Sequence, residues 1–366
     1  MLSSLLDILI CPFCRGSRLR LLRTVLKEDE IQTGEILCED CRRKYPIIEG
    51  IPCLLNKEQL KAHKGTMLQE WLQRMEEVGK NIIDEDQKTY KDACKVAIGK
   101  EEIEEDTERL LWEKKLYKDN QTLRKELGGK FEAKWAIARE NIRVRNDHVF
   151  SFIEESKGDF SGKRVLNVGP GTDEDLLERL ESKGAEVINC DIILEPLTEM
   201  ISHGRRESVC SDLKSLPFDS ECFDAVFCFH VVHHIDPIEQ ALSEAVRVLK
   251  PKGKIFIVEL NYYHLLSFFG RIIPNVVKKR LRKMVRRLTK TKERIFKPSP
   301  YEKVVKSRSL TGAIKRAGCI KVIRKTVTHA PIIFPDSIIK VWNGIAFRLS
   351  LIFDPIALEY LFVGEK

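Results

Sequence analysis

The chain has 366 residues, of which 43% are hydrophobic, enough to build a sizeable core in at least one of two or three folded units. Its 63 basic and 55 acidic residues leave a formal net charge of +8, too small a surplus to indicate an anionic partner by itself. No uninterrupted apolar run reaches about 18 residues, so the sequence predicts no membrane-spanning helix.

The N-terminus and the cysteines indicate a reducing compartment. The first ten residues are apolar but have no basic leader, and they run into Cys11 without a small-residue cleavage site, so we expect no signal peptide. Most cysteines after residue 90 stand singly in apolar segments, among them Cys190, Cys210 and Cys228, as buried free thiols do. We therefore expect a cytoplasmic protein.

Two Cys-x-x-Cys pairs, separated by residues 15–37, lie near the start of the chain. Each pair can place two sulfurs on one tight turn, so together they supply the four thiolates of a closed tetrahedral zinc site. Because the protein would fill all four positions, the zinc would be structural rather than catalytic. Two disulfides or idle thiols are the alternative, and Cys53 is expected to be a small apolar residue. The predicted ligands are Cys11, Cys14, Cys38 and Cys41.

The residues around these pairs alternate as short strands do. Leu19–Leu26 and Glu35–Leu37 form a predicted hairpin with Thr33-Gly34 as its turn, and residues 45–52 continue as strand and turn. A unit of about 55 residues has too little core to stand alone, so bound metal would supply much of its stability.

The same segment resembles a known family of zinc ribbons. The resemblance rests on Leu9-Ile10-Cys11-Pro12-Phe13-Cys14, on the second cysteine pair and on Tyr45-Pro46-Ile47 followed by Gly50-Ile51-Pro52. The family comprises small activators of tRNA and protein methyltransferases, and its ribbon is also found fused in front of methyltransferase domains. The resemblance covers residues 1–55.

Residues 56–160 form a predicted helical region that connects the ribbon to the rest of the chain. The region holds little glycine or proline, and its apolar residues recur three and four positions apart. Breaks between helices are expected at Ile98-Gly99 and Gly128-Gly129. Its acidic runs are interpreted as solvated helix faces.

From residue 161 to the C-terminus, predicted strands and helices alternate. This order indicates an α/β fold with a parallel sheet covered by helices on both faces. The predicted strands are 164–168, 185–190, 208–210, 223–229, 254–260, 320–327 and 357–363, and the predicted helices are 172–183, 194–202, 237–249 and 310–317.

The strand at 164–168 ends at Gly169-Pro170-Gly171, a glycine turn that leads into a helix. Glycines let a ligand approach the backbone closely at the carboxyl end of a strand, the usual ligand site of an open α/β sheet. A dinucleotide-binding turn would have a third glycine, and here its diphosphate would meet Asp173, Glu174 and Asp175 and be repelled. A ligand with a cationic amino-acid end, such as S-adenosylmethionine, suits these acids better.

Later motifs resemble class I S-adenosylmethionine-dependent methyltransferases, and within them the small-molecule group most closely. The motifs are Asp212-Leu213, residues 216–226, His233-His234-Ile235-Asp236-Pro237 and residues 241–254. The resemblance covers about residues 163–260. It implies a Rossmann-like, seven-stranded, mostly parallel sheet whose last two strands form an antiparallel hairpin, and it implies methyl transfer from S-adenosylmethionine.

The resemblance assigns the glycine turn to the methionine end of the cofactor. Gly169 and Gly171 would flank that end, with Pro170 between them. Asn167 stands where the family often has an acidic residue, and its amide can still hydrogen-bond the ammonium group. The family usually has a small residue where Asp173 stands.

The resemblance assigns the adenosine to the ends of the next two strands. Asp191 would hold the ribose hydroxyls, and Ile192 would lie beside the adenine. Asp212 would accept a hydrogen bond from the adenine amine, and Leu213 would pack on the ring.

Phe229 and His230, at the end of the strand 223–229, would line the sulfonium pocket. Methyl transfer can rest largely on the alignment of donor and acceptor, so a base is not obligatory. If the acceptor is a hydroxyl, a base would help, and His230 and His233 are the candidates. The alternative is that these histidines belong to the scaffold.

Two insertions bear on the acceptor. Residues 262–300 join an aromatic stretch to a basic amphipathic helix, which can lie on an anionic membrane surface, bind a phosphate backbone or act as a solvated lid. Residues 331–356 are strongly apolar and are interpreted as core or lid, because Lys340 and Arg348 interrupt them. We therefore expect a small-molecule or lipid-linked acceptor and a peripheral place at the membrane, whereas the weak aromatic interleaving argues against nucleic acid.

The expected domains are a zinc ribbon at 1–55, a helical connection at 56–160 and a methyltransferase domain at 161–366. Two other functions stay open. The ribbon can direct methylation of tRNA or protein, or the chain can be a non-catalytic cofactor-binding partner. A nicotinamide-dependent oxidoreductase is disfavoured by the glycine turn.

Overall fold

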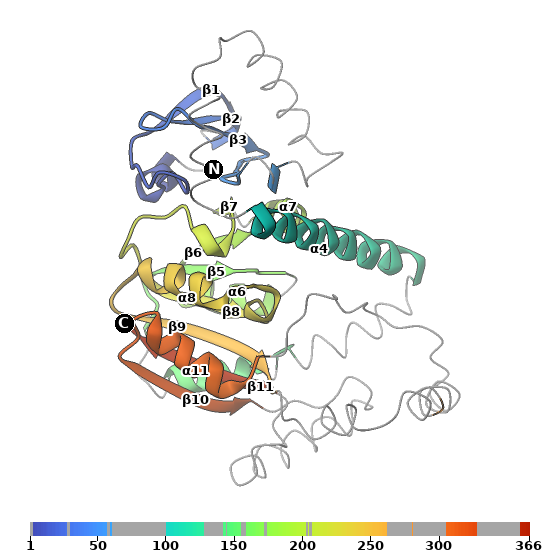
Figure 1. Cartoon of the computed structure of the whole chain (residues 1–366), viewed down its shortest axis with the longest axis vertical. Helices are drawn as coiled ribbons and strands as arrows, with labels where there is room; N and C mark the ends of the chain where they lie inside the picture. The colour runs from blue at the N-terminus through green and yellow to red at the C-terminus, as the bar shows by residue number, and fades with distance from the viewer. Residues whose placement is uncertain are drawn as a thin grey trace. The chain divides into compact units, whose positions relative to one another are not determined.

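The computed structural model describes residues 3–27, 30–56, 59–60, 100–127, 142–143, 145–154, 159–171, 174–202, 204, 207–261, 280, 305–327 and 359–366. Within them the chain forms a four-stranded sheet and a seven-stranded sheet (Figure 1). Two compact units are present, one of Met1–Tyr117 with Ile188–Cys222 and one of Lys118–Val187 with Phe223–Lys366. The predicted insertions at 262–300 and 331–356, apart from residue 280, lie outside the described residues.

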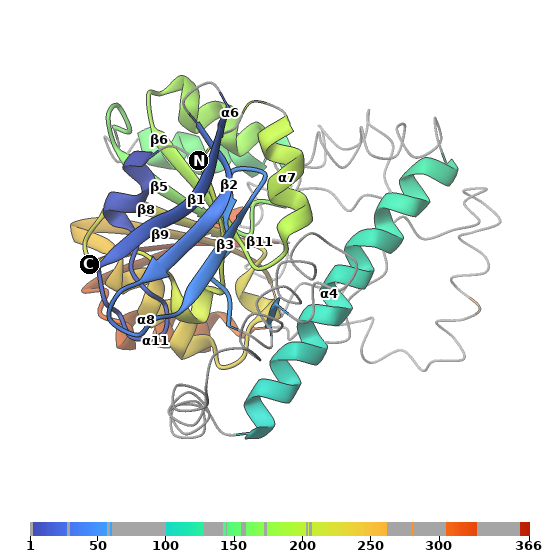
Figure 2. The ribbon, with the colours of Figure 1, turned by 90° about the horizontal axis from the view of Figure 1, so that it is seen from above.

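The N-terminal segment of the first unit is an antiparallel sheet in the order β1-β2-β3-β4, whose first three strands lie side by side in Figure 2. A short helix, η1 (Ser3–Ile8), precedes it. The strands form because apolar and polar residues alternate along them, which buries Ile36, Tyr45 and Ile47 on one side. The strands are β1 (Leu19–Lys27), β2 (Glu30–Cys38), β3 (Lys44–Ile48) and β4 (Ile51–Pro52).

The predicted turn at Thr33-Gly34 is wrong. β2 runs through both residues, and the pairing of Lys27 with Glu30 shows that the chain reverses between them. A Cβ on Gly34 would lie 3.1 Å from Thr24 Cγ2 and 3.2 Å from the Leu22 carbonyl oxygen. Glycine at position 34 therefore allows β1 and β2 to approach closely, at a place where their pairing is irregular.

The ribbon packs against a later part of the same unit. The backbone N–H of Ile10 donates to the Pro217 carbonyl at 2.9 Å, and that of Leu54 donates to the Cys210 carbonyl at 2.9 Å. Residue 53 forms a parallel bridge with residue 210. Both ends of the ribbon are thus fixed to the segment that contains β7 (Ser208–Cys210) and η2 (Leu213–Ser215).

An apolar cluster extends this contact. Ile48, Ile51, Cys53 and Leu55 of the ribbon and its exit pack with the start of α7 (Leu194–Ser202) and with Cys210. The ribbon therefore shares a core with the residues that follow β6 (Glu186–Asp191) instead of standing as a free module. The long helix α4 (Lys100–Leu127) begins just after the predicted break at Ile98-Gly99 and ends just before Gly128-Gly129.

The seven-stranded sheet has the order β10-β11-β9-β8-β5-β6-β7. Its pairs β5–β8, β8–β9 and β6–β7 are parallel, while β11 pairs antiparallel with both β9 and β10. The predicted mostly parallel sheet with a closing antiparallel hairpin is confirmed. The strands of the second unit are β5 (Arg164–Val168), β8 (Phe223–Phe229), β9 (Leu249–Leu260), β10 (Lys321–Val327) and β11 (Glu359–Glu365).

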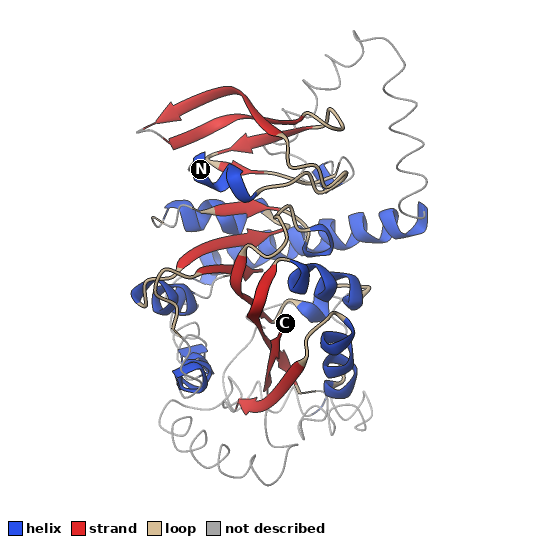
Figure 3. Ribbon diagram, turned by 90° about the vertical axis from the view of Figure 1, so that its left-hand side faces the viewer, coloured by secondary structure: helices blue, strands red, loops and turns tan. Residues whose placement is uncertain are grey.

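Helices cover both faces of the sheet in the second unit (Figure 3). On one face, helical residues 145–154 and α6 (Glu174–Ser182) bury Phe150 and Leu180 against Phe227. Phe227 stacks on Phe256, with ring centroids 4.7 Å apart. On the other face lie α8 (Ile238–Arg247), whose buried side includes Leu242 and Val246, and α11 (Ser307–Arg316).

β9 begins at Leu249, before the predicted start at residue 254, because residues 251–253 form an irregularity inside the strand. The pairing with β8 jumps from Phe223 opposite Leu249 to Ala225 opposite Lys254. Lys252 takes a positive φ of 66° there, and the backbone of Lys366 hydrogen-bonds both Lys252 and Gly253. The extra residues are thus held by the C-terminus.

No helix among the described residues is long and apolar enough to cross a membrane. The cysteines in the described part of the chain form no disulfide. Burial raises the pKa of Cys190 to about 12, so this thiol stays protonated in the core, as the apolar surroundings in the sequence predict.

Candidate functional site

The four predicted zinc ligands lie together. The Sγ atoms of Cys11, Cys14, Cys38 and Cys41 are all within 4.8 Å of one another, and two pairs, 11 with 41 and 14 with 38, are 3.6 Å apart. In a tetrahedral site with Zn–S bonds of about 2.3 Å the sulfurs would be about 3.8 Å apart. The donor set and its size therefore fit a structural zinc ion.

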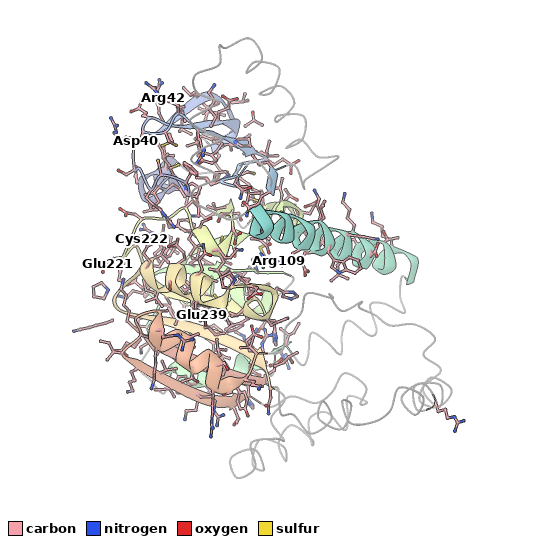
Figure 4. All side chains as sticks on the ribbon, in the orientation of Figure 1. Asp40, Arg42, Arg109, Glu221, Cys222 and Glu239 are labelled. Carbon is pink, nitrogen blue, oxygen red and sulfur yellow. The ribbon has the colours of Figure 1, made fainter. Side chains whose placement is uncertain are left out.

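Two backbone turns of the same form present these sulfurs. Arg15 follows the first pair and Arg42 the second, with positive φ of 62° and 61°. Each donates its backbone N–H to the carbonyl of the first cysteine of its pair at 2.9 Å. Arg42 and the neighbouring Asp40 are exposed at the edge of the ribbon (Figure 4).

Tyr45 supports the first ligand. Its hydroxyl lies 3.0 Å from Cys11 Sγ, and its side chain is buried. Burial raises the pKa of the Tyr45 hydroxyl far above its usual range, so the hydroxyl stays protonated and can donate to a thiolate. Cys53 lies outside the cluster, where its thiol donates to the Ile51 carbonyl, in accord with the predicted apolar role.

The glycine turn follows β5 in the second unit. Asn167 is buried within β5, Pro170 is buried, and Gly169 and Gly171 have φ of +61° and +52°. A Cβ on Gly169 would lie 2.4 Å from Val231 Cγ2, whereas on Gly171 the nearest heavy atom would be 3.9 Å away. Contact with Val231 is therefore enough to require glycine at position 169. Only the space beside Gly171 leaves room for a ligand.

One of the acidic side chains that follow the glycine turn is engaged in hydrogen bonds within the protein. Asp173 lies outside the described residues. Asp175 accepts from Asn146 Nδ2 at 2.9 Å and from Arg179 Nε at 2.7 Å. The negative charge expected beside the turn is thus partly neutralised by α6 itself.

Asp191 and Ile192 lie where β6 ends in the first unit. The Asp191 carboxylate accepts the backbone N–H of Ile193 at 2.9 Å and stays partly exposed. The backbone of Ser211 donates to the Asp191 carbonyl, which brings Asp191 close to the segment with Asp212 and Leu213. The end of β6 therefore offers a reachable carboxylate, the group that ribose hydroxyls need.

Asp212 is nearly covered, with 4% of its surface exposed. Its Oδ1 accepts from Lys214 N at 2.9 Å and its Oδ2 from Gln59 Nε2 at 2.8 Å. Gln59 is itself fixed, because its Oε1 accepts the backbone N–H of Asn56 while Asn56 Oδ1 accepts that of Gln59. The carboxylate predicted to bind the adenine amine thus holds the chain that leaves the ribbon.

The predicted catalytic histidines lie at the end of β8. The centroids of their rings are 6.3 Å apart. His230 takes a positive φ of 57°, which is rare for a residue other than glycine. His230 Nε2 lies 2.9 Å from Glu359 Oε1, and His233 Nδ1 lies 2.8 Å from Glu259 Oε2. Both glutamates are buried, with 3% of their surface exposed.

Phe229, predicted to line the sulfonium pocket, is buried beside His230. The guanidinium of Arg145 lies 5.2 Å from the centre of its ring, and Arg145 is itself held by Asn146 Oδ1 at 3.0 Å. One face of the ring is therefore covered by a cation of the chain.

Sequence reasoning missed Gln59, Glu259 and Glu359. The only signal for the glutamates was an acidic residue at the end of each of two apolar strands, Glu259 in 254–260 and Glu359 in 357–363. The histidine that each of these glutamates contacts could not be predicted, because the sequence does not show which strands are neighbours in the sheet.

Comparisons with known proteins confirm both resemblances found in the sequence. Residues 166–257 match the family model described as a methyltransferase domain. Residues 3–50 match the family model described as Trm112p-like protein. Two separate segments of the chain are thus similar to a methyltransferase domain and to a Trm112p-like protein.

Among curated relatives, the mitochondrial ubiquinone biosynthesis O-methyltransferase of Rattus norvegicus is 29% identical over 160 residues, which cover 41% of this chain and 45% of the relative. The ubiquinone/menaquinone biosynthesis C-methyltransferase UbiE of Cereibacter sphaeroides is 31% identical over 136 residues, 31% of this chain and 54% of the relative. The chain spans about half the length of these two relatives.

Solved structures with a similar fold include a methyltransferase from Archaeoglobus fulgidus, with 22% identity, a TM-score of 0.39 and coverage of 60% of this chain and 94% of that one. A second is a complex that includes the Haloferax volcanii Trm112 methyltransferase activator, with 15% identity, a TM-score of 0.42 and coverage of 66% and 96%.

Proposed function

We propose that this protein is an S-adenosylmethionine-dependent methyltransferase that methylates an oxygen of a small, quinone-type aromatic acceptor. Support for the reaction class comes from the methyltransferase-domain match at 166–257. The acceptor class is drawn from relatives whose names refer to ubiquinone and menaquinone biosynthesis. A lipid-linked acceptor and a peripheral place at the membrane belong to this proposal.

The observation that carries the proposal is the pairing of His230 and His233 with buried carboxylates at the carboxyl end of β8. A carboxylate that accepts one ring N–H of a histidine fixes its tautomer and leaves the other nitrogen able to take a proton. Glu259 is fixed in turn, because its Oε1 accepts the backbone N–H groups of Val232 and His233 at 2.9 and 3.3 Å. A histidine held in this way can take the proton that methylation of a hydroxyl releases.

In the proposed reaction, bound S-adenosylmethionine supplies an electrophilic methyl group on a sulfonium that leaves as a neutral thioether. Asn167, Gly169, Pro170 and Gly171 are assigned to its methionine end, Asp191 and Ile192 to its ribose and adenine, and Asp212 and Leu213 to its adenine. His233 accepts the hydroxyl proton through its second ring nitrogen, and the acceptor oxygen forms the new bond to carbon. Glu259 stabilises the resulting imidazolium.

The fit to the cofactor differs between these residues. Gly171 leaves open space, and the carboxylate of Asp191 is partly exposed, so both suit the assigned contacts. The carboxylate of Asp212 is engaged with Gln59 and Lys214, so contact with an amine requires Gln59 to yield or to share it. A structural zinc in the Cys11, Cys14, Cys38 and Cys41 cluster completes the proposed cofactors.

The test is transfer of a labelled methyl group from S-adenosylmethionine to catechol-type quinone precursors. His233→Ala is expected to lower kcat about 100-fold while the dissociation constant for the cofactor changes little. His234→Gln, at the neighbouring histidine, is the control. Equal kcat in the wild type and in His233→Ala would contradict the role of this base, and methylation of ring carbon alone would contradict the acceptor atom.

A further inference from the structure

A cavity of about 610 Å³ opens in the second unit, at the amino end of its parallel strands. Its lining comes from residues that precede β5, from the starts of β8, β9 and β10, and from the end of the antiparallel β11. The glycine turn and the histidines of the proposed reaction lie at the other end of β5 and β8. Sites for small organic molecules measure about 300–1,000 Å³, so this cavity can hold a ligand of its own.

The floor of the cavity is apolar. Phe256 of β9 lies opposite Val363 of β11, which in turn lies opposite Ile323 of β10, so these three residues form an apolar row on one face of the sheet. Three further apolar side chains line the cavity: Phe152, Ile153 and Phe160. The cavity therefore offers a hydrocarbon chain contact with several different elements.

A charged row borders the apolar row. Lys254 lies opposite Glu365, and Glu365 lies opposite Lys321. Each of these residues is two positions along its strand from a residue of the apolar row, so its side chain is on the same face of the sheet. One carboxylate of the lining is thus placed between two ammonium groups.

A second carboxylate of the lining is also shared by two lysines. Asp224 Oδ2 accepts from Lys250 Nζ at 2.7 Å, and Asp224 Oδ1 lies 3.8 Å from Lys163 Nζ. The remaining charged residues of the described lining are one acid and one base, Asp159 and Lys252. Five lysines therefore face three carboxylates, which leaves an excess of two positive charges around an apolar floor.

We propose that this cavity binds a single-chain amphiphile that ends in a phosphate monoester. A phosphate monoester carries a charge of about −1.5 to −2 at pH 7, which balances the excess of the lining, whereas a carboxylate carries only half as much. Lysine binds phosphate as a compact point charge. The hydrocarbon chain of the ligand lies on the apolar row, and the site is independent of methyl transfer.

The test is a calorimetric titration of the full-length protein with dodecyl phosphate, kept below its micelle concentration at pH 8 and low ionic strength. The wild type is expected to bind one dodecyl phosphate per chain. Dodecanoate and inorganic phosphate are each expected to bind about tenfold more weakly or less, because the first lacks one charge and the second lacks the chain.

The double variant Lys254→Gln with Lys321→Gln is expected to weaken binding of dodecyl phosphate about tenfold or more. If the double variant fails to fold, Lys321→Gln alone decides, because the side chain of Lys321 is exposed. Lys315→Gln is the matched control and is expected to bind as the wild type does. It removes the same charge from an exposed position of α11, which covers the other face of the sheet.

Four results would overturn the site. The wild type can show no saturable binding of dodecyl phosphate, or it can bind dodecanoate or inorganic phosphate equally well. The lysine variants can bind as the wild type does. A loss as large in Lys315→Gln would show general attraction to a basic surface instead of a site.

Discussion

Two glycines of one turn meet different surroundings. Gly169 and Gly171 both take positive φ, a conformation that costs a residue with a Cβ about 1–2 kcal/mol. Only Gly169 also faces a side chain, Val231 Cγ2, at a distance that no Cβ can tolerate. An alanine at position 171 therefore costs only the free energy of the backbone conformation, whereas an alanine at position 169 also costs the free energy of the clash with Val231.

Gly169→Ala is expected to lower the free energy of unfolding by about 3 kcal/mol and Gly171→Ala by about 1 kcal/mol. Urea unfolding of both variants measures the difference. Equal losses would show that Val231 moves aside and that packing does not require glycine at 169.

At the same scale, the histidine pairs show why a motif is easier to predict than its partners. His230 and His233 are only three positions apart and follow a strand, so their place at a strand end could be predicted. Their carboxylates lie 26 residues beyond His233 and on the last strand of the chain. The antiparallel pairing of β11 with β9 places Glu359 opposite Leu260, next to the end of β9, and this pairing could not be predicted from the sequence.

The ribbon is the element whose stability we expect to depend on a bound ion. Its strands bury Ile36, Ile47 and Ile51, but the cysteine turns that join them are held mainly by local hydrogen bonds. The four ligands could be predicted from spacing, because each pair is local in sequence. The hairpin turn could not, because a glycine in a strand and a glycine in a turn look alike when the partner strand is unknown.

Cys14→Ser is expected to release the zinc, and Cys53→Ala is expected to keep one zinc per chain. Cys14 is exposed, so its replacement removes a ligand without opening a cavity, whereas Cys53 is buried outside the cluster, where its thiol donates to the Ile51 carbonyl. Metal analysis after dialysis gives the result. Zinc retained in Cys14→Ser, or lost in a folded Cys53→Ala, would contradict the assignment.

The side-chain amide of Gln59 links the chain that leaves the ribbon to Asp212. Gln59 donates to Asp212 while its oxygen completes the hydrogen-bonded box with Asn56. Glutamate at position 59 would keep the box but would place a second carboxylate against Asp212.

Gln59→Glu is therefore expected to destabilise the protein more than Gln59→Ala at pH 7, by about 1 kcal/mol. The excess should vanish near pH 4, because protonation of either carboxylate removes the repulsion and restores a donor. Urea unfolding at both pH values tests this. A Gln59→Glu variant as stable as Gln59→Ala at pH 7 would show that this contact does not fix the chain.

For the whole molecule, the order of elements could be predicted well from the sequence. α7, β7 and β8 have the predicted bounds, and the antiparallel hairpin closes the sheet. The docking of the ribbon on the β7 segment could not be predicted. It depends on contacts such as Leu9 with Phe218 and Gln59 with Asp212, whose partners are far apart in the chain. The three-part domain division stays a prediction.

The central claim, that the chain binds S-adenosylmethionine rather than a dinucleotide, is tested most directly by calorimetry on the full-length protein. The account predicts one S-adenosylmethionine bound per chain, no detectable heat with NAD, and binding weakened about tenfold in Asp191→Ala, which loses the ribose contact. Binding of NAD, or no binding of S-adenosylmethionine by folded protein, would contradict it.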